Sequence, residues 1–167
     1  MIRKYPILGN CVLCGVLFAG GDLIASTLAN RQQLYPSALR ALTYGACVYG
    51  PIASIVTYPI LNALGPRMRP LSQLVTRTAL DQLCFAPFVY TPMYFGVIAL
   101  MEKQPPAVVA QRIDSTWWYT VKANWKVWIP VQLLNFAITP PHLRILVVGV
   151  VGLFWNTFLA LQNAAQH

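Results

Sequence analysis

The chain has 167 residues, of which 57% are hydrophobic and only 10% are charged, and its formal net charge is +8. Soluble domains carry about a quarter charged residues, so twelve basic and four acidic side chains exclude an ordinary soluble surface, while the apolar content excludes disorder. The longest basic run is the pair Arg3-Lys4, which excludes a nucleic-acid footprint and leaves a membrane protein with basic loops near anionic lipid head groups.

Long runs without charge indicate transmembrane helices. About 20 mostly apolar residues cross a bilayer core as a helix, and the short segments of alternating polarity that mark a membrane β-barrel do not occur in the sequence. We therefore predict an all-α integral membrane helical bundle, a single domain over 1–167 with about four transmembrane helices. Their approximate spans are 5–29, 41–64, 79–101 and 127–163, the last with a break near 139–142.

The segment 107–122 differs from the apolar runs around it. Val109, Ile113, Trp117 and Val121 recur at four-residue steps, so they share one helical face. This pattern predicts an amphipathic helix in the membrane interface that leads into the next span; a tryptophan-rich loop packed on the bundle is the alternative. Indole rings favour the head-group level, and the expected interface anchors are Trp117, Trp118, Trp125, Lys126 and Trp128.

Small and polar residues recur at helical spacing inside the predicted spans. The candidates for the bundle interior or a pore lining are Asp22, Arg77, Asp81, Gln82, Gln132, Asn135 and Asn156. Such stripes serve either helix packing or a water-filled path, and both interpretations stay open. The two aspartates are the sharpest signals, because an acid at bilayer depth costs roughly 2.5–3.5 kcal/mol on insertion scales and faces a cavity or a partner. For Asp81, a local ion pair with Arg77 near the membrane surface is the alternative.

Motifs for catalysis and metal binding are missing from the sequence. The spacing Cys11-x-x-Cys14 lies in an apolar run and predicts buried thiols rather than a redox or metal site. We expect no enzyme, no catalytic residues, no metal and no cofactor. Prolines interrupt the spans, tend to kink their helices and free carbonyls that must face protein or water; they are Pro51, Pro59, Pro87, Pro92 and Pro130.

The sequence from Trp125 onward resembles a known signature. The matching residues are Trp125-Lys126-Val127-Trp128, Gln132, Asn135-Phe136, Pro140, Arg144 and Trp155-Asn156, with Gly21-Asp22, Gly50-Pro51, Arg77, Asp81-Gln82 and Pro87 upstream. Together these spacings resemble the Mpv17 / PMP22 (peroxisomal membrane protein 22) family of small multi-pass membrane proteins, over nearly the whole chain. The match departs from the family pattern at Ser26, Val56-Thr57, Ile129 and Ala160.

The resemblance implies a four-span protein of the mitochondrial inner membrane or the peroxisomal membrane that forms a weakly selective channel for small solutes. The alternative is a non-conducting structural accessory subunit of a larger mitochondrial membrane complex. We expect the mitochondrial inner membrane because little of the chain precedes the first span. The expected partners are membrane lipids and a large membrane protein complex or further copies of the chain, without nucleic acid.

Overall fold

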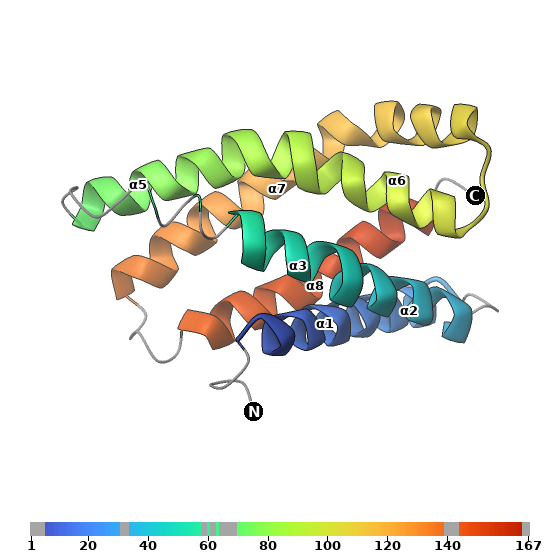
Figure 1. Cartoon of the computed structure of the whole chain (residues 1–167), viewed down its shortest axis with the longest axis horizontal. Helices are drawn as coiled ribbons and strands as arrows, with labels where there is room; N and C mark the ends of the chain where they lie inside the picture. The colour runs from blue at the N-terminus through green and yellow to red at the C-terminus, as the bar shows by residue number, and fades with distance from the viewer. Residues whose placement is uncertain are drawn as a thin grey trace.

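Long helical rods run back and forth along the molecule (Figure 1). The computed structural model describes residues 6–30, 34–57, 60, 63, 70–138 and 144–164, and this part of the chain contains helices and no strand. The elements are α1 (Pro6–Leu28), α2 (Leu34–Thr43), η1 (Tyr44–Tyr49), α3 (Gly50–Ile52), η2 (Ala53–Thr57), α5 (Pro70–Leu80), η3 (Asp81–Tyr90), α6 (Thr91–Met101), α7 (Pro106–Ile138) and α8 (Arg144–Ala164), where η marks a π-helical segment.

Three of these rods are long and apolar enough to cross a membrane. They cover Ile7–Leu28, Tyr35–Thr57 and Leu71–Met101, and Val147–Asn163 is a shorter apolar helix. The outward face of α1 is apolar, with Leu8, Val12 and Val16 all more than half exposed at four-residue steps. An apolar outer face of this kind suits lipid. The predicted fold class, an all-α membrane bundle, is confirmed.

Two rods begin earlier than the sequence predicts. The second starts at Leu34 instead of 41, and the third starts at Pro70 instead of 79. The expected boundaries followed the charged residues Arg40 and Arg77, yet each lies within a rod, about two turns from its beginning. Long basic side chains carry an apolar stem and a charged tip, so a helix continues through them near its ends without placing the charge in lipid.

The region after residue 106 also differs from its expected boundaries. Residues 107–122 belong to α7, one continuous helix of 33 residues that packs antiparallel along α6 and η3. The predicted span 127–163 is divided between the end of α7 and the antiparallel α8 (Figure 1), and its expected break at 139–142 lies outside the described residues. No glycine interrupts the sequence between 107 and 138, and Pro130 is accommodated within the helix.

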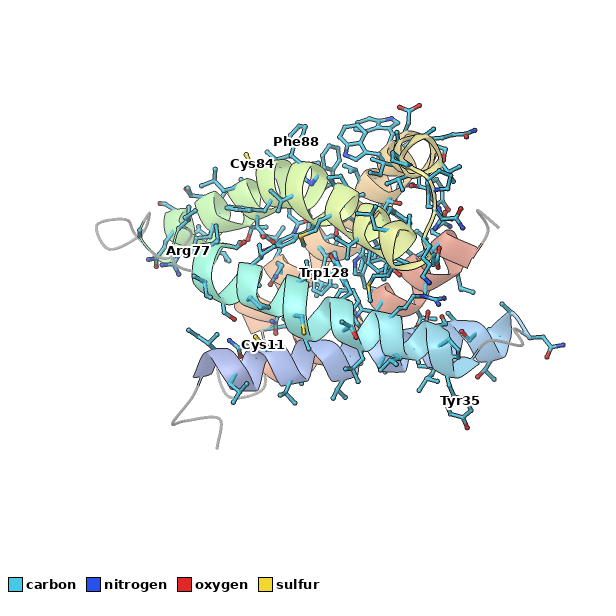
Figure 2. All side chains as sticks on the ribbon, turned by 45° about the vertical axis from the view of Figure 1, so that its right-hand side comes forward. Cys11, Tyr35, Arg77, Cys84, Phe88 and Trp128 are labelled. Carbon is cyan, nitrogen blue, oxygen red and sulfur yellow. The ribbon has the colours of Figure 1, made fainter. Side chains whose placement is uncertain are left out.

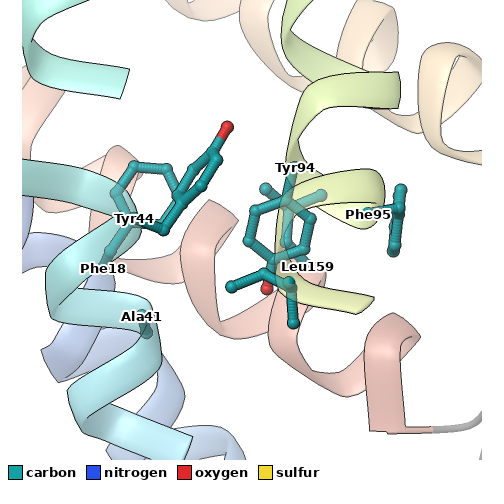
Figure 3. Packing of buried hydrophobic residues seen from close by; sticks show 7 residues of the cluster. Phe18, Ala41, Tyr44, Tyr94, Phe95 and Leu159 are labelled. Carbon is teal, nitrogen blue, oxygen red and sulfur yellow. The ribbon is translucent and has the colours of Figure 1, made fainter. Parts of the chain in front are cut away.

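A cluster of buried apolar residues, rich in aromatic rings, packs between the rods (Figure 3). We call it the aromatic cluster, and its members are Phe18, Ala41, Tyr44, Tyr94, Phe95, Ile98 and Leu159. The rings of Phe18 and Tyr44 meet edge to face at 5.0 Å, and Tyr44 meets Tyr94 in the same way at 5.3 Å. Edge-to-face pairs at this separation are favourable beyond the area that they bury. The cluster joins α1, η1, α6 and α8, the last through Leu159, and thereby fixes the positions of the polar groups around it.

Glycine allows α1 to approach its neighbours closely. A Cβ added to Gly21 would lie 2.6 Å from the Asn156 Cβ and 2.8 Å from backbone atoms of α8. A Cβ added to Gly45 in η1 would lie 2.6 Å from the Cys14 carbonyl oxygen. Small residues at membrane helix crossings permit such contacts, so α1 is held tightly between the second rod and α8.

Candidate functional site: buried polar clusters

Asp22 lies on the inner face of α1 and is only 7% exposed. Its Oδ2 accepts a hydrogen bond from the Ser37 hydroxyl of α2 at 2.5 Å and another from the Ser26 hydroxyl, one turn along α1, at 3.4 Å. We call Asp22, Ser26 and Ser37 the serine–aspartate cluster. Hydroxyl donors from two helices compensate in part for the removal of this acid from water.

A charge cluster links four helices where α6 ends and α7 begins. The Arg112 guanidinium donates to Glu102 Oε2 at 2.8 Å and to Asn163 Oδ1 at 3.0 Å, while the Asn163 amide donates to Glu102 Oε1 at 3.2 Å. Arg40 of α2 lies 3.6 Å from Glu102. The Arg112 and Glu102 side chains are 3% and 8% exposed, so this is a buried ion pair, and removing one partner would leave the other charge uncompensated.

An amide cluster joins η3 to α7. The Gln82 amide donates to Asp81 Oδ2 at 2.9 Å, and its carbonyl accepts a 2.5 Å hydrogen bond from the Asn124 amide. Gln82 and Asn124 are buried, whereas Asp81 is half-buried. The structure therefore gives Asp81 a neighbouring amide as a hydrogen-bond partner.

Two indole groups of α7 bind backbone carbonyls that prolines leave free. In η3 the N–H of Thr91 donates to the Ala86 carbonyl, five residues back, as in a π-helix. In this pattern residues 87 and 92 would donate to the carbonyls of residues 82 and 87. Both are prolines, which have no N–H, so these two carbonyls lack a backbone donor. Trp125 Nε1 donates to the Gln82 carbonyl and Trp117 Nε1 to the Pro87 carbonyl, each at 2.6 Å. These tryptophans thus satisfy both carbonyls and bind α7 to η3.

The other residues predicted from the sequence have separate surroundings. Asn135 and Asn156 are buried, Arg77 and Gln132 are half-buried, and Asn156 lies at the close crossing of α8 with Gly21. Of the predicted interface anchors, Trp118 is 50% exposed. Trp117, Trp125 and Trp128 are half-buried, and Lys126 is exposed. The structure therefore divides the predicted set among several clusters.

The sequence interpretation missed the charge cluster and Asn124. Arg112, Thr116, Thr120 and Asn124 recur at four-residue steps and are all less than a tenth exposed. The prediction used the adjacent apolar face, which includes the fully buried Val121, and did not consider these four polar residues. The signal that could have identified the cluster was Glu102, the only glutamate in the chain, since an acid between apolar runs needs a partner.

Comparison with known proteins identifies related chains. A family model described as the Mpv17 / PMP22 family matches residues 99–160. "Protein SYM1" of Mycosarcoma maydis is 39% identical over 159 residues, which cover 93% of this chain and 79% of that protein. "Protein SYM1" of Saccharomyces cerevisiae is 36% identical over 172 residues, covering 98% and 86%. No solved structure matches the chain.

Proposed function

We propose that this chain, which belongs to the Mpv17 / PMP22 family of membrane proteins, forms a weakly selective channel for small solutes in the mitochondrial inner membrane. The supporting observation is the set of polar side chains that the helices enclose. The described residues bury fourteen polar or charged side chains and fourteen hydrophobic ones, while large apolar side chains cover much of the outside. Polar and ionisable groups at membrane depth commonly line solute and ion pathways.

The described conformation corresponds to a closed state of this channel. The aromatic cluster packs the rods against one another, and the acids accept hydrogen bonds from neighbouring side chains. Opening would separate rods that contain prolines and π-helical turns, which occur frequently at functional sites. The second and third rods both contain such turns, and their Tyr49 and Tyr90 rings lie 5.0 Å apart.

A specific observation supports a second candidate, the non-conducting accessory subunit of a larger mitochondrial complex. Phe88 is 68% exposed and points outward from η3 (Figure 2), and its ring lies 6.1 Å from that of Trp117. The 50% exposed Trp118 stacks on Trp117 at 5.6 Å. Exposed aromatic groups are the usual anchors of protein interfaces, although they also suit the lipid head-group region. The peroxisomal membrane is the alternative location.

Electrical recording from the purified chain in planar bilayers tests the proposal. If Asp22 and Asp81 face the conduction path, Asp22→Asn and Asp81→Asn change the cation-to-anion permeability ratio, because charged rings govern which ions enter a narrow path. Asp114→Asn is the matched control, since Asp114 is exposed on α7. Currents whose selectivity is unchanged in both folded variants would remove these carboxylates from the path and leave the channel intact.

The same preparation separates the two candidate functions. A channel passes current without other proteins, whereas an accessory subunit passes none and purifies at fixed stoichiometry with a large complex from mitochondria. Absence of wild-type current in several lipid mixtures, together with such a complex, would contradict the channel. Fractionation of mitochondria and peroxisomes that contain the tagged chain tests its location.

A further inference from the structure

One face of α7 carries a polar stripe that is enclosed by other helices. We call Arg112, Thr116, Thr120 and Asn124 the α7 stripe; each is one turn from the next, and all are buried. Arg112 contacts the end of α6 and α8 through Glu102 and Asn163, while Asn124 contacts η3 through Gln82. The stripe therefore runs along the rod Leu71–Met101, which is long enough to cross a membrane.

Two atoms of the stripe lack a protein partner among the described residues. They are Nε of Arg112 and Oγ1 of Thr120, in residues that are 3% and 0% exposed. Buried polar atoms nearly always have a partner, and an orphan indicates an unseen water or ion. Both atoms belong to one stripe, two turns apart, so a shared cause is the simplest account.

Thr120 differs from other helical threonines of the chain. Threonine in a helix commonly bonds the carbonyl four residues back, as four others do here: Thr27, Thr43, Thr116 and Thr157. The Thr120 hydroxyl makes no such bond. Its hydrogen-bonding capacity is therefore not used by its own backbone, although the residue is 0% exposed.

We infer that the α7 stripe is hydrated and forms the wall of the path along which water and small polar solutes move. This inference deepens the proposed channel by locating its path beside α7 rather than through the aromatic cluster. Arg112 and Asn124 are twelve residue steps apart, about 18 Å at 1.5 Å per step, which is more than half of a core roughly 30 Å thick.

The chemistry of the stripe suits ordered water. A buried water needs two to four polar partners. Arg112 Nε donates, the Thr120 hydroxyl donates and accepts, and the Thr116 oxygen retains a lone pair after donating to the Arg112 carbonyl. Glu102 pairs with the Arg112 guanidinium at one end of the stripe, and the other three residues of the stripe are uncharged.

Thiol accessibility tests the inference directly. In a background where Cys11, Cys14, Cys47 and Cys84 are replaced by alanine, Thr120→Cys and Val121→Cys are made separately. Thr120 and Val121 are both 0% exposed, but only Thr120 lies on the stripe. In liposomes, a trimethylammonium methanethiosulfonate reagent reaches sulfur only through water. We expect at least a tenfold faster reaction at residue 120 than at residue 121; equally slow reactions overturn the inference.

Solute flux provides a second readout that does not need cysteine. Thr120→Val keeps the shape and removes the hydroxyl, whereas Thr120→Ser keeps the hydroxyl. We expect Thr120→Val to lower the release of a small sugar from liposomes several-fold and Thr120→Ser to stay near wild type, with equal helicity and melting. Unchanged flux in a folded Thr120→Val protein overturns the inference. Fast modification of Thr120→Cys in a chain that passes no solute supports hydration of the stripe and rejects the channel.

Discussion

At the scale of single residues, the buried ion pair between Glu102 and Arg112 is the contact whose disruption we expect to lower the stability of the bundle most. We expect Glu102→Leu to destabilise the bundle by about 3–5 kcal/mol, because it leaves the buried Arg112 guanidinium without its carboxylate. Adding Arg112→Met should restore most of that loss, since a well-packed apolar pair removes the uncompensated charge. Thermal unfolding in detergent, followed by circular dichroism, measures both variants.

Asp114→Leu is the control for this pair, because Asp114 is exposed on the same helix. Exposed substitutions away from special contacts change stability by less than about 0.5 kcal/mol. A double variant as unstable as Glu102→Leu alone would show that packing, and not the buried charge, dominates at this position.

The sequence revealed some of these residues and concealed others for a physical reason. Asp22 was identifiable because it is an acid within an apolar run, and the structure buries it beside Ser37. Arg112 was concealed because it follows polar Gln111 and precedes exposed Asp114, so its neighbours resemble a solvated face. Its partners Glu102 and Asn163 come from two other helices, and a single sequence does not state which helices meet.

At the scale of secondary-structure elements, η3 depends on the indole groups of α7. We expect Trp125→Phe to destabilise the protein by about 1–2 kcal/mol, because the Gln82 carbonyl loses its donor inside the bundle. In a Pro87→Ala background a backbone N–H again becomes available, so the same change should cost less. Unfolding of the wild type, the two single variants and the double variant in detergent gives the coupling energy between Trp125 and Pro87.

Trp118→Phe serves as the matched control for Trp125→Phe, since its indole is half exposed and stacks on a neighbouring ring. We expect a change below about 0.5 kcal/mol for this variant. If Trp125→Phe lowers stability equally with and without Pro87, the Trp125 indole does not compensate for the missing proline N–H, and this account of η3 is contradicted.

The crossing of α1 and α8 depends on the absence of a side chain at Gly21. We expect Gly21→Ala to destabilise by about 1–3 kcal/mol, because the new Cβ would overlap backbone atoms and force the helices apart. Gly152→Ala is the control: no described atom lies within 4 Å of its added Cβ. Alanine there should stabilise α8 by about 0.4–1 kcal/mol. Equal effects in thermal unfolding would contradict this account of the crossing.

The rods themselves were largely predictable, but their continuity was not. Uncharged apolar runs predicted the three membrane-length rods, because the removal of apolar side chains from water is the main force that drives such runs out of the aqueous phase. The sequence predicted that the helix 107–122 leads into the next span, but it did not predict that both belong to one continuous helix, α7. Lys122 lies over the Trp118 ring at 5.7 Å, so an aromatic face accommodates its charge and α7 continues.

At the scale of the whole molecule, large apolar side chains cover much of the described surface, and the interior contains polar groups beside an apolar core. This arrangement forms the basis for the proposed channel, and the α7 stripe gives that channel a route. The packing of the rods around the aromatic cluster explains why the described conformation is closed. A channel that opens only when the rods separate predicts a low but measurable permeability to small solutes, rather than that of a permanently open pore.

The most direct test of the central claim is solute release from liposomes that contain only the purified, folded chain. We predict that a small uncharged sugar leaves these vesicles faster than it leaves protein-free vesicles, while a large dextran stays inside. Release no faster than from protein-free vesicles, from chain with intact helicity and in several lipid mixtures, would contradict the claim that this bundle conducts.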